Sequence, residues 1–209
     1  YGSSAASDVY KRQDQEREKF DRETIMQMFD KIFEEDRVFI HAHFGTNEID
    51  DIFAKLRYLI VGCDCKWVVV DHLHMLVSAV HDGDERRAID SIMTRLRSLV
   101  EETGAGLILV SHLRRVDGNK GHENGVEVSL SHLRGSNSIG QLSDCVIALE
   151  RNQQSSDELE ARTTKLRVLK SRYTGDVGMA SALVYDKDTG RLAEEDMSEF
   201  EVEDNGISI

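Results

Sequence analysis

Apolar residues recur three or four positions apart in three segments of the chain, and this spacing predicts amphipathic helices. The segments are 14–36, 46–60 and 84–103. Thr46 and Asn47 are suitable caps for the second helix. Gly104 stands directly after the third, where a residue in the left-handed region would end it.

Short, uninterrupted apolar runs alternate with these helices and predict buried strands. The runs are 38–44, 67–70, 107–110 and 144–150. This order indicates an α/β fold, with a mostly parallel sheet and helices on both faces. Farther along, 165–172 and 179–185 alternate around a turn with two glycines, and 188–190 closes another hairpin. The fold is therefore expected to end in a β-hairpin region.

Polar residues follow the predicted strands at their carboxyl ends, where ligands bind in such sheets. Asp71 follows the strand predicted at 67–70, His112 follows that at 107–110, and Arg151 follows that at 144–150. An apolar run ending in aspartate is typical of the magnesium-side carboxylate of phosphate-loop enzymes, although a helix-capping aspartate is the simpler alternative. His112 is a candidate sensor of a γ-phosphate or, alternatively, a satisfied core histidine.

Composition favours one globular domain, because the 209 residues are 40% hydrophobic. No apolar run approaches the roughly 20 residues that span a bilayer, and no secretion signal is present. We therefore expect a soluble, cytoplasmic protein without membrane contact. Cys63, Cys65 and Cys145 match neither a disulfide framework nor a zinc pattern, so we expect reduced thiols.

Charge is distributed unevenly along the chain. The formal net charge of -13 by itself argues against nucleic acid as a partner. However, residues 193–209 contain many acids and no lysine or arginine, which predicts a disordered acidic tail. Basic residues gather instead in 114–120 and 162–172. Residues 1–13, rich in serine and alanine, are interpreted as a leader or scar, and 14–192 as the domain.

Seven short segments resemble, in order and spacing, the phage primase-helicases, which are related to DnaB and Twinkle among the superfamily-four ring helicases. They are WVVVDH (67–72), DERR (84–87), SHL (111–113), LRGS (133–136), QLSD (141–144), LERN (149–152) and TGD (174–176). The resemblance implies a RecA-like domain that assembles into a hexameric ring. It also implies a replicative DNA helicase that hydrolyses ATP or dTTP with Mg²⁺, moves 5′–3′ on single-stranded DNA and unwinds duplexes. If the protein is phage-encoded, this activity takes place in the host cell cytoplasm.

The resemblance also implies roles for single residues. Asp71 would be the Mg²⁺ ligand, His112 the γ-phosphate sensor, and Arg172 an arginine finger offered to the neighbouring subunit. Further nucleotide contacts would come from Arg151, Tyr185 and Lys170, the first two at the base. DNA-binding positions would be Arg114 and Lys120 in a central-channel loop, with Arg134 and Gln141 beside it. The acidic tail is similar in kind to the family's, which makes a DNA polymerase a possible partner.

The chain departs from this pattern in one major respect. No G-x-x-x-x-G-K-[ST] segment, which would cradle the triphosphate, occurs anywhere, and the catalytic glutamate is missing too. We interpret the chain as a fragment that begins inside the helicase domain, and expect it not to hydrolyse nucleotide efficiently by itself. Gly118 and Gly140 stand where the family can carry basic residues near DNA, so we expect weaker DNA binding.

Three other classes of protein remain open. A metal-dependent hydrolase is suggested by His41 and His43, and by Asp71, His72 and His74 near a strand end, although no H-E-x-x-H helix accompanies them. A non-catalytic module for DNA binding or ring assembly would keep the fold without turnover. A RecA-type recombinase shares the fold but forms helical filaments instead of rings.

Overall fold

The chain divides into two compact units, Tyr1–Gly45 and Thr46–Ile209. The computed structural model describes residues 22–33, 38–40, 49–77, 84–115, 121–187 and 189–195. In the first unit, α2 (Arg22–Phe33) confirms the central part of the predicted helix 14–36. Residues 38–40 are exposed and form no strand, so the strand predicted at 38–44 is wrong for its described part. No described strand pairs with them, and an apolar run needs such a partner for its backbone hydrogen bonds.

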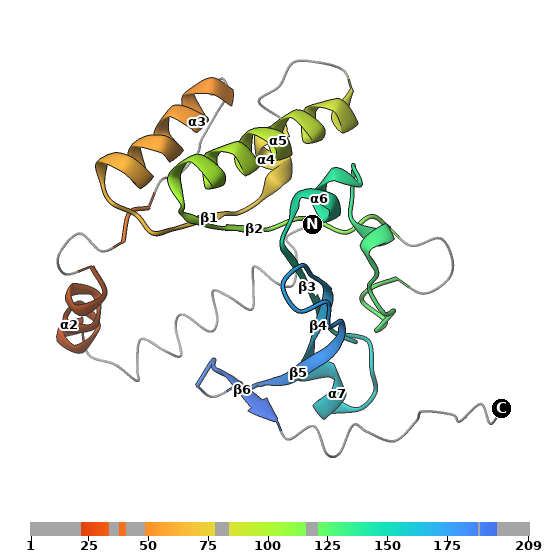
Figure 1. Ribbon diagram of the computed structural model, residues 1–209. Helices are drawn as coiled ribbons and strands as arrows, with labels where there is room; N and C mark the ends of the chain where they lie inside the picture. Colours follow the sequence, from red (N-terminus) through yellow and green to blue (C-terminus); the bar gives the residue numbers. More distant parts are fainter. Residues whose placement is uncertain are drawn as a thin grey trace. The chain divides into compact units, whose positions relative to one another are not determined.

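The second unit begins with two parallel strands and the helices that pack on them (Figure 1). α3 (Ile49–Arg57) continues into the π-helical turn η2 (Tyr58–Gly62). Next come β1 (Trp67–Val70), α4 (Leu73–Val77), α5 (Glu85–Thr103) and β2 (Gly106–Leu109). The prediction of α5 is confirmed at both ends. The Asp84 carboxylate accepts hydrogen bonds from two backbone N–H groups of the first turn, and Gly104 adopts a left-handed conformation.

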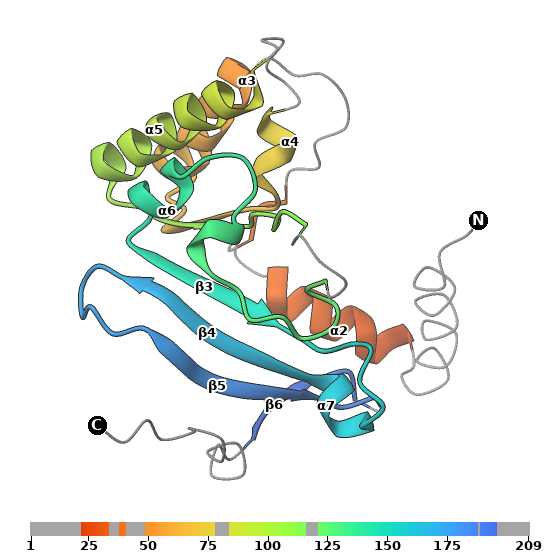
Figure 2. The same ribbon diagram turned by 90° about the vertical axis from the view of Figure 1, so that its right-hand side faces the viewer.

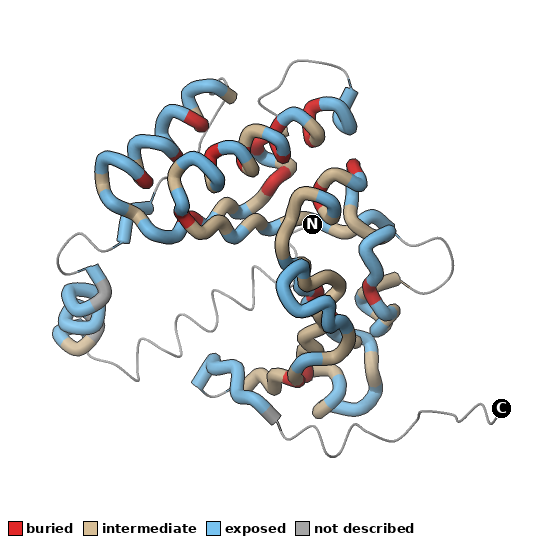
Figure 3. Tube along the Cα trace, in the orientation of Figure 1, coloured by how far each residue is buried: buried red, intermediate tan, exposed pale blue. Residues whose placement is uncertain are grey.

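The hydrophobic core lies between these helices and one face of the β1–β2 pair, as the buried positions in Figure 3 illustrate. Its largest fully buried side chains are Leu73, Ile89, Ile92 and Leu96. On the opposite face Trp67, Val69 and Ile108 are 69%, 63% and 51% exposed. Alternate residues of a strand point to opposite faces, so this is the face on which the second layer of helices was predicted. Among the described residues of the second unit, no helix covers this face.

Trp67 lies over Gly106 of the neighbouring strand. The two residues are paired in the parallel register, and a Cβ atom on residue 106 would stand 2.3 Å from a carbon of the Trp67 ring. Glycine therefore leaves the room that the indole ring occupies on β2.

The rest of the unit contains a four-stranded antiparallel sheet in the order β3–β4–β5–β6 (Figure 2). Its strands are β3 (Cys145–Glu150), β4 (Thr163–Ser171), β5 (Gly178–Tyr185) and β6 (Leu192–Glu195). The short helices are η3 (Leu130–His132), α6 (Ser138–Leu142) and α7 (Glu158–Arg162). The two predicted hairpins are confirmed by the pairing of β5 with β4 and β6.

β3 pairs antiparallel with β4, so among the described strands β1–β2 is the one parallel pair. The sheet predicted as mostly parallel thus has, in its described part, one parallel pair beside an antiparallel sheet. The physical reason lies in the connections. The segment with α7 returns the chain to the end at which β3 stopped, and tight turns join the later strands, which favours antiparallel pairing.

β6 also corrects the predicted start of the acidic tail. Disorder was predicted from Ala193 onward, but residues 193–195 pair with β5 as an edge strand. Acidic composition predicts disorder where no neighbouring strand is available, whereas an edge strand tolerates charged side chains because they reach solvent. Residues 1–13 and 196–209 lie outside the described residues, so the leader and the rest of the tail stay predictions.

Cys63, Cys65 and Cys145 are free thiols, as predicted. Among the described helices, none combines the length and apolar character needed to cross a membrane.

Candidate functional site

Asp71 and His112 lie at the same edge of the β1–β2 pair, as the predicted parallel pairing requires. The last residues of the two strands are in register, and the Val110 N–H donates to the Val70 carbonyl oxygen at 3.0 Å. Asp71 is exposed, and no described residue donates a hydrogen bond to its carboxylate. The alternative in which Asp71 caps the following helix therefore has no contact in its favour. A free carboxylate at this edge fits a Mg²⁺ ligand, because Mg²⁺ binds through one or two carboxylates together with phosphate oxygens.

Three histidines gather at this edge. The ring centroids of His72 and His112 are 4.0 Å apart, those of His74 and His112 are 5.4 Å apart, and those of His72 and His74 are 6.0 Å apart. One ring nitrogen from each lies within 4.8 Å of the others. We call these residues the histidine cluster. The sequence pointed to all three residues but placed His112 in one hypothesis and His72 and His74 in another. Their proximity follows from the register of β1 against β2.

Burial and charge both act on His74. Burial lowers the pKa of the His74 imidazole, and the nearby Arg134 guanidinium and the His112 and His72 rings lower it further, while Glu85 opposes them. Both ring nitrogens of His74 are buried and lack a hydrogen-bond partner among the described residues, as does Nδ1 of His72. The Glu85 carboxylate is 3.8 Å from Nε2 of His74, which is longer than a hydrogen bond.

Two predicted DNA-binding arginines come from segments that run side by side next to the cluster. Leu113 and Leu133 form an antiparallel bridge, in which Arg114 lies opposite His132 and Arg134 lies opposite His112. The Arg134 N–H donates to the His112 carbonyl oxygen at 3.1 Å, and the Arg134 guanidinium pairs with Glu85 at 3.2 Å. Arg114 is exposed. Lys120 and Gly118 lie outside the described residues, as do His41 and His43 of the hydrolase hypothesis.

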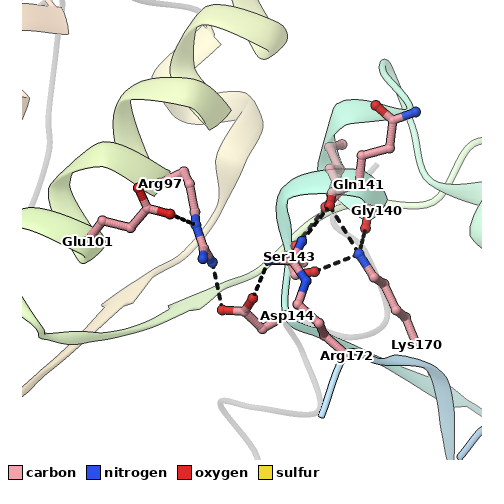
Figure 4. A network of polar contacts seen from close by, with 9 residues as sticks. Arg97, Glu101, Gly140, Gln141, Ser143, Asp144, Lys170 and Arg172 are labelled. Atoms are coloured by element: carbon pink, nitrogen blue, oxygen red, sulfur yellow. Dashed lines mark hydrogen bonds and ion pairs between the residues drawn. The ribbon is translucent and has the colours of Figure 1, made fainter. Parts of the chain in front are cut away.

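Lys170 and Gln141 meet where β4 passes the end of α6 (Figure 4). The Lys170 ammonium donates to the carbonyl oxygens of Gly140, Gln141 and Ser143 at 2.7, 3.0 and 2.8 Å. These carbonyls belong to the last turn of α6 and the residue that follows it, where a cation is favourable. Lys170, which was predicted to contact the nucleotide, thus caps the C-terminus of α6 in this structure. This role could not be read from the sequence, because the two segments are far apart along the chain.

Arg172 is held near the same place by an ion pair. Its guanidinium lies 2.9 Å from the Asp144 carboxylate and donates to the Gln141 carbonyl oxygen at 3.1 Å (Figure 4). Asp144 also pairs with Arg97 of α5 at 2.7 Å, and Arg97 in turn pairs with Glu101. Hydrogen bonds to Glu101 and then Asp144 raise the pKa of Arg97. The side chain of Arg172, the predicted arginine finger, is 44% exposed, so these contacts enclose it only partly.

Arg151 and Tyr185 lie at the opposite end of the antiparallel sheet from Arg172. Arg151 directly follows β3 and Tyr185 ends β5, two strands away, which corresponds to about 10 Å. Arg151 is exposed, and its Nε donates to the Ala161 carbonyl oxygen at 2.7 Å. Lys165 of β4 pairs with the last residue of β3. The distance along β4 from Lys165 to Arg172 is roughly 24 Å. The structure therefore separates the two groups of predicted nucleotide contacts.

Glu150, just before Arg151, was not singled out from the sequence. It is 6% exposed and accepts hydrogen bonds from the Val128 N–H at 2.8 Å and from the Arg167 guanidinium at 2.9 Å. Arg167 also contacts Glu127 at 3.0 Å. A buried carboxylate that is paired in this way ties the loop before η3 to the sheet that carries Arg151.

Comparisons with known proteins give a family and a relative. A family model described as the DnaB-like helicase C terminal domain matches residues 4–194. The match begins inside 1–13, the segment interpreted as a leader or scar. The DNA helicase/primase of Enterobacteria phage T3 is 40% identical over 164 residues, which cover 78% of this chain. The same alignment covers 28% of that protein, so the chain spans less than a third of this relative's length.

Two solved structures share the fold. A structure of a DnaB-like replicative helicase and its interactions with primase has a TM-score of 0.56 at 21% identity, covering 70% of this chain and 35% of that one. A KaiC-like protein from the archaeon Pyrococcus horikoshii OT3 has a TM-score of 0.53 at 13% identity, covering 79% and 64%. These likenesses confirm the predicted RecA-like α/β fold.

Proposed function

Because the chain belongs to the DnaB-like helicase C-terminal domain family, we propose that it is the motor domain of a replicative DNA helicase. In this proposal the whole protein couples hydrolysis of ATP or dTTP to 5′–3′ movement on single-stranded DNA and to duplex unwinding. The observation that carries it is the edge of β1–β2, where Asp71, with a free carboxylate, and His112 both follow the ends of paired parallel strands.

At this edge Asp71 would hold Mg²⁺, which neutralises charge on the phosphates when it is bound. His112 stands three residues after the end of the adjacent strand β2, where it would sense a γ-phosphate. The contact from the Arg134 N–H to the His112 carbonyl supports a mechanical link, because a displacement of His112 would be felt in the segment with Arg134. Hydrolysis and DNA contact would be coupled over this short path.

The separation of the nucleotide contacts supports a site shared between subunits. Arg151 and Tyr185 stand at one end of the antiparallel sheet and Arg172 at the other, roughly 24 Å along β4. At this separation, Arg172 is better placed to contact a different nucleotide from the one that Arg151 and Tyr185 contact. In a hexameric ring, each subunit would bind the base through Arg151 and Tyr185 and offer Arg172 to its neighbour. Lys170 would have to exchange its carbonyl partners for a phosphate to contribute.

For DNA we propose phosphate contacts from Arg114, Lys120, Arg134 and Gln141. Such contacts ignore base sequence, as movement along any strand requires, and they respond to salt because they release counterions. A contact between the acidic tail and a DNA polymerase is part of the same proposal.

The test is nucleotide hydrolysis with and without single-stranded DNA, in this chain and in the chain extended upstream by a phosphate-binding loop. We expect DNA-stimulated turnover only in the extended protein, and its loss in the variant Asp71→Asn, which keeps shape but not charge. Turnover that survives this substitution would remove Asp71 from the Mg²⁺ role.

A second candidate is a non-catalytic module for DNA binding or ring assembly, which the absence of a G-x-x-x-x-G-K-[ST] segment favours for this chain taken alone. DNA binding and rings without hydrolysis in the extended protein would support that candidate. Helical filaments in electron micrographs would instead support a RecA-type recombinase.

A further inference from the structure

We propose that His72, His74 and His112 form a binding site for a transition-metal ion, Zn²⁺ in particular, distinct from the oxygen ligand that Asp71 offers to Mg²⁺. The site deepens the proposed function, because a metal bound there would occupy the γ-phosphate sensor. The existence of the site, however, rests on the geometry of the cluster alone.

The distances fit one small ion. Ring nitrogens that are 4.8 Å from one another lie about 2.8 Å from their common centre, whereas a Zn–N bond is about 2.1 Å. In this widest case each nitrogen would move inward by about 0.7 Å, which a small rotation of each side chain supplies. Three imidazoles are a complete protein ligand set for zinc with one position left open.

The chemical state of the nitrogens also fits a metal. Nδ1 of His72 and both ring nitrogens of His74 are buried and lack hydrogen-bond partners among the described residues. A buried polar atom without a partner is unfavourable, and a bound ion would compensate for it. When His74 binds metal through one nitrogen, the other N–H needs an acceptor. The Glu85 carboxylate is placed for this role at 3.8 Å from Nε2 of His74, since carboxylates commonly orient metal-bound imidazoles.

The donor type separates this site from the Mg²⁺ site beside it. Imidazole nitrogen suits zinc, copper and nickel, whereas Mg²⁺ prefers carboxylate and phosphate oxygens. His112 is the exposed member of the cluster, so an ion from solvent can reach the site on its side. Occupancy would hold the His112 ring against His72 and His74. The proposed consequence is inhibition of hydrolysis by zinc.

The test is a titration of the 209-residue chain with Co²⁺ and with Zn²⁺, in the absence of nucleotide and DNA. Visible absorption reports the coordination geometry of Co²⁺, and calorimetry reports the affinity and stoichiometry of Zn²⁺. We expect one ion per chain. His74→Asn and His112→Asn should each weaken binding by about 100-fold or more, and Glu85→Gln by about 10-fold, as is usual for an orienting carboxylate.

His132→Asn is the matched control. His132 is a histidine outside the cluster whose Nδ1 accepts a hydrogen bond from the Ser129 N–H, a role that an asparagine oxygen can take over. Its substitution should leave metal binding unchanged. Thermal unfolding of each variant shows whether the fold is kept, and the exposed His112 keeps the test available if His74→Asn unfolds.

Two results would overturn the proposal. One is the absence of stoichiometric binding by the folded chain, and the other is binding that persists unchanged in both His74→Asn and His112→Asn. Because these measurements need no turnover, they are independent of the helicase assignment. In the extended protein, zinc inhibition that a zinc-selective chelator reverses, and that His74→Asn abolishes, would establish the regulatory consequence.

Discussion

Replacing Arg172 with alanine in the protein extended upstream is expected to lower DNA-stimulated turnover by about a thousandfold, with nucleotide affinity changed only a few-fold. A thousandfold effect corresponds to about 4 kcal/mol of transition-state stabilisation. The resting contact of Arg172 is much weaker. Its side chain is 44% exposed and that of Asp144 is 28% exposed, so solvent screening limits this ion pair to about 1 kcal/mol or less. The proposed finger role therefore requires only a weak contact to break when Arg172 leaves Asp144.

The same comparison predicts the effect of removing the resting partner. Asp144→Asn removes the ion pair that holds Arg172 at rest. Because this pair is worth about 1 kcal/mol or less, its removal should raise turnover by no more than about fivefold. Arg172→Lys should recover little, because an ammonium lacks the planar fork of a guanidinium. Arg191→Ala, at an exposed arginine in the turn before β6, is the matched control and should behave like the unchanged protein.

The assay combines steady-state hydrolysis with titration of a fluorescent nucleotide. Mixed rings test the trans geometry, because an Asp71→Asn subunit still offers Arg172 to an Arg172→Ala neighbour whose Asp71 is intact. Mixing two inactive variants should therefore restore part of the activity. No restoration, or a loss of nucleotide binding in Arg172→Ala equal to the loss of turnover, would refute the finger role. Loss of turnover in Asp144→Asn would show that the contact within one subunit is the functional one.

Three further predictions concern the rest of the unit. Gly106→Ala should lower the free energy of unfolding by about 1–3 kcal/mol, because the added Cβ would overlap the Trp67 ring. Urea unfolding followed by Trp67 fluorescence measures this change. An unchanged urea midpoint would contradict the packing of Trp67 on Gly106. Arg114→Ala and Arg134→Ala should each reduce the slope of log affinity for single-stranded DNA against log salt by about one, and equal slopes would argue against phosphate contact. Since the folded state lowers the pKa of His74 below the ordinary value of about 6.5, the stability linked to this group is complete above that pH and is lost as pH falls through and below it. Between pH 7.5 and pH 5, the urea midpoint of unfolding should change less in His74→Asn than in the unchanged protein. An identical change in both proteins would show that other groups cause the effect.

The sequence alone predicted those features that depend on neighbours along the chain. The apolar spacing and Gly104 predicted α5 almost to the residue, because helix geometry repeats every few residues. The hairpins after β4 were predictable because turn glycines and alternating residues are local signals. The expectation that Asp71 and His112 share an edge also held, since parallel strands end together.

Only the tertiary structure brought together residues that are far apart along the chain. The histidine cluster depends on the register of β1 against β2, and a shift of one position would turn side chains to the other face. The anchoring of Lys170 and Arg172 at the end of α6 depends on contacts across about thirty residues. The antiparallel pairing of β3 and the strand formed by acidic residues in β6 were likewise decided by available partners. Local pattern encodes which elements form, whereas backbone pairing between distant segments decides which side chains meet.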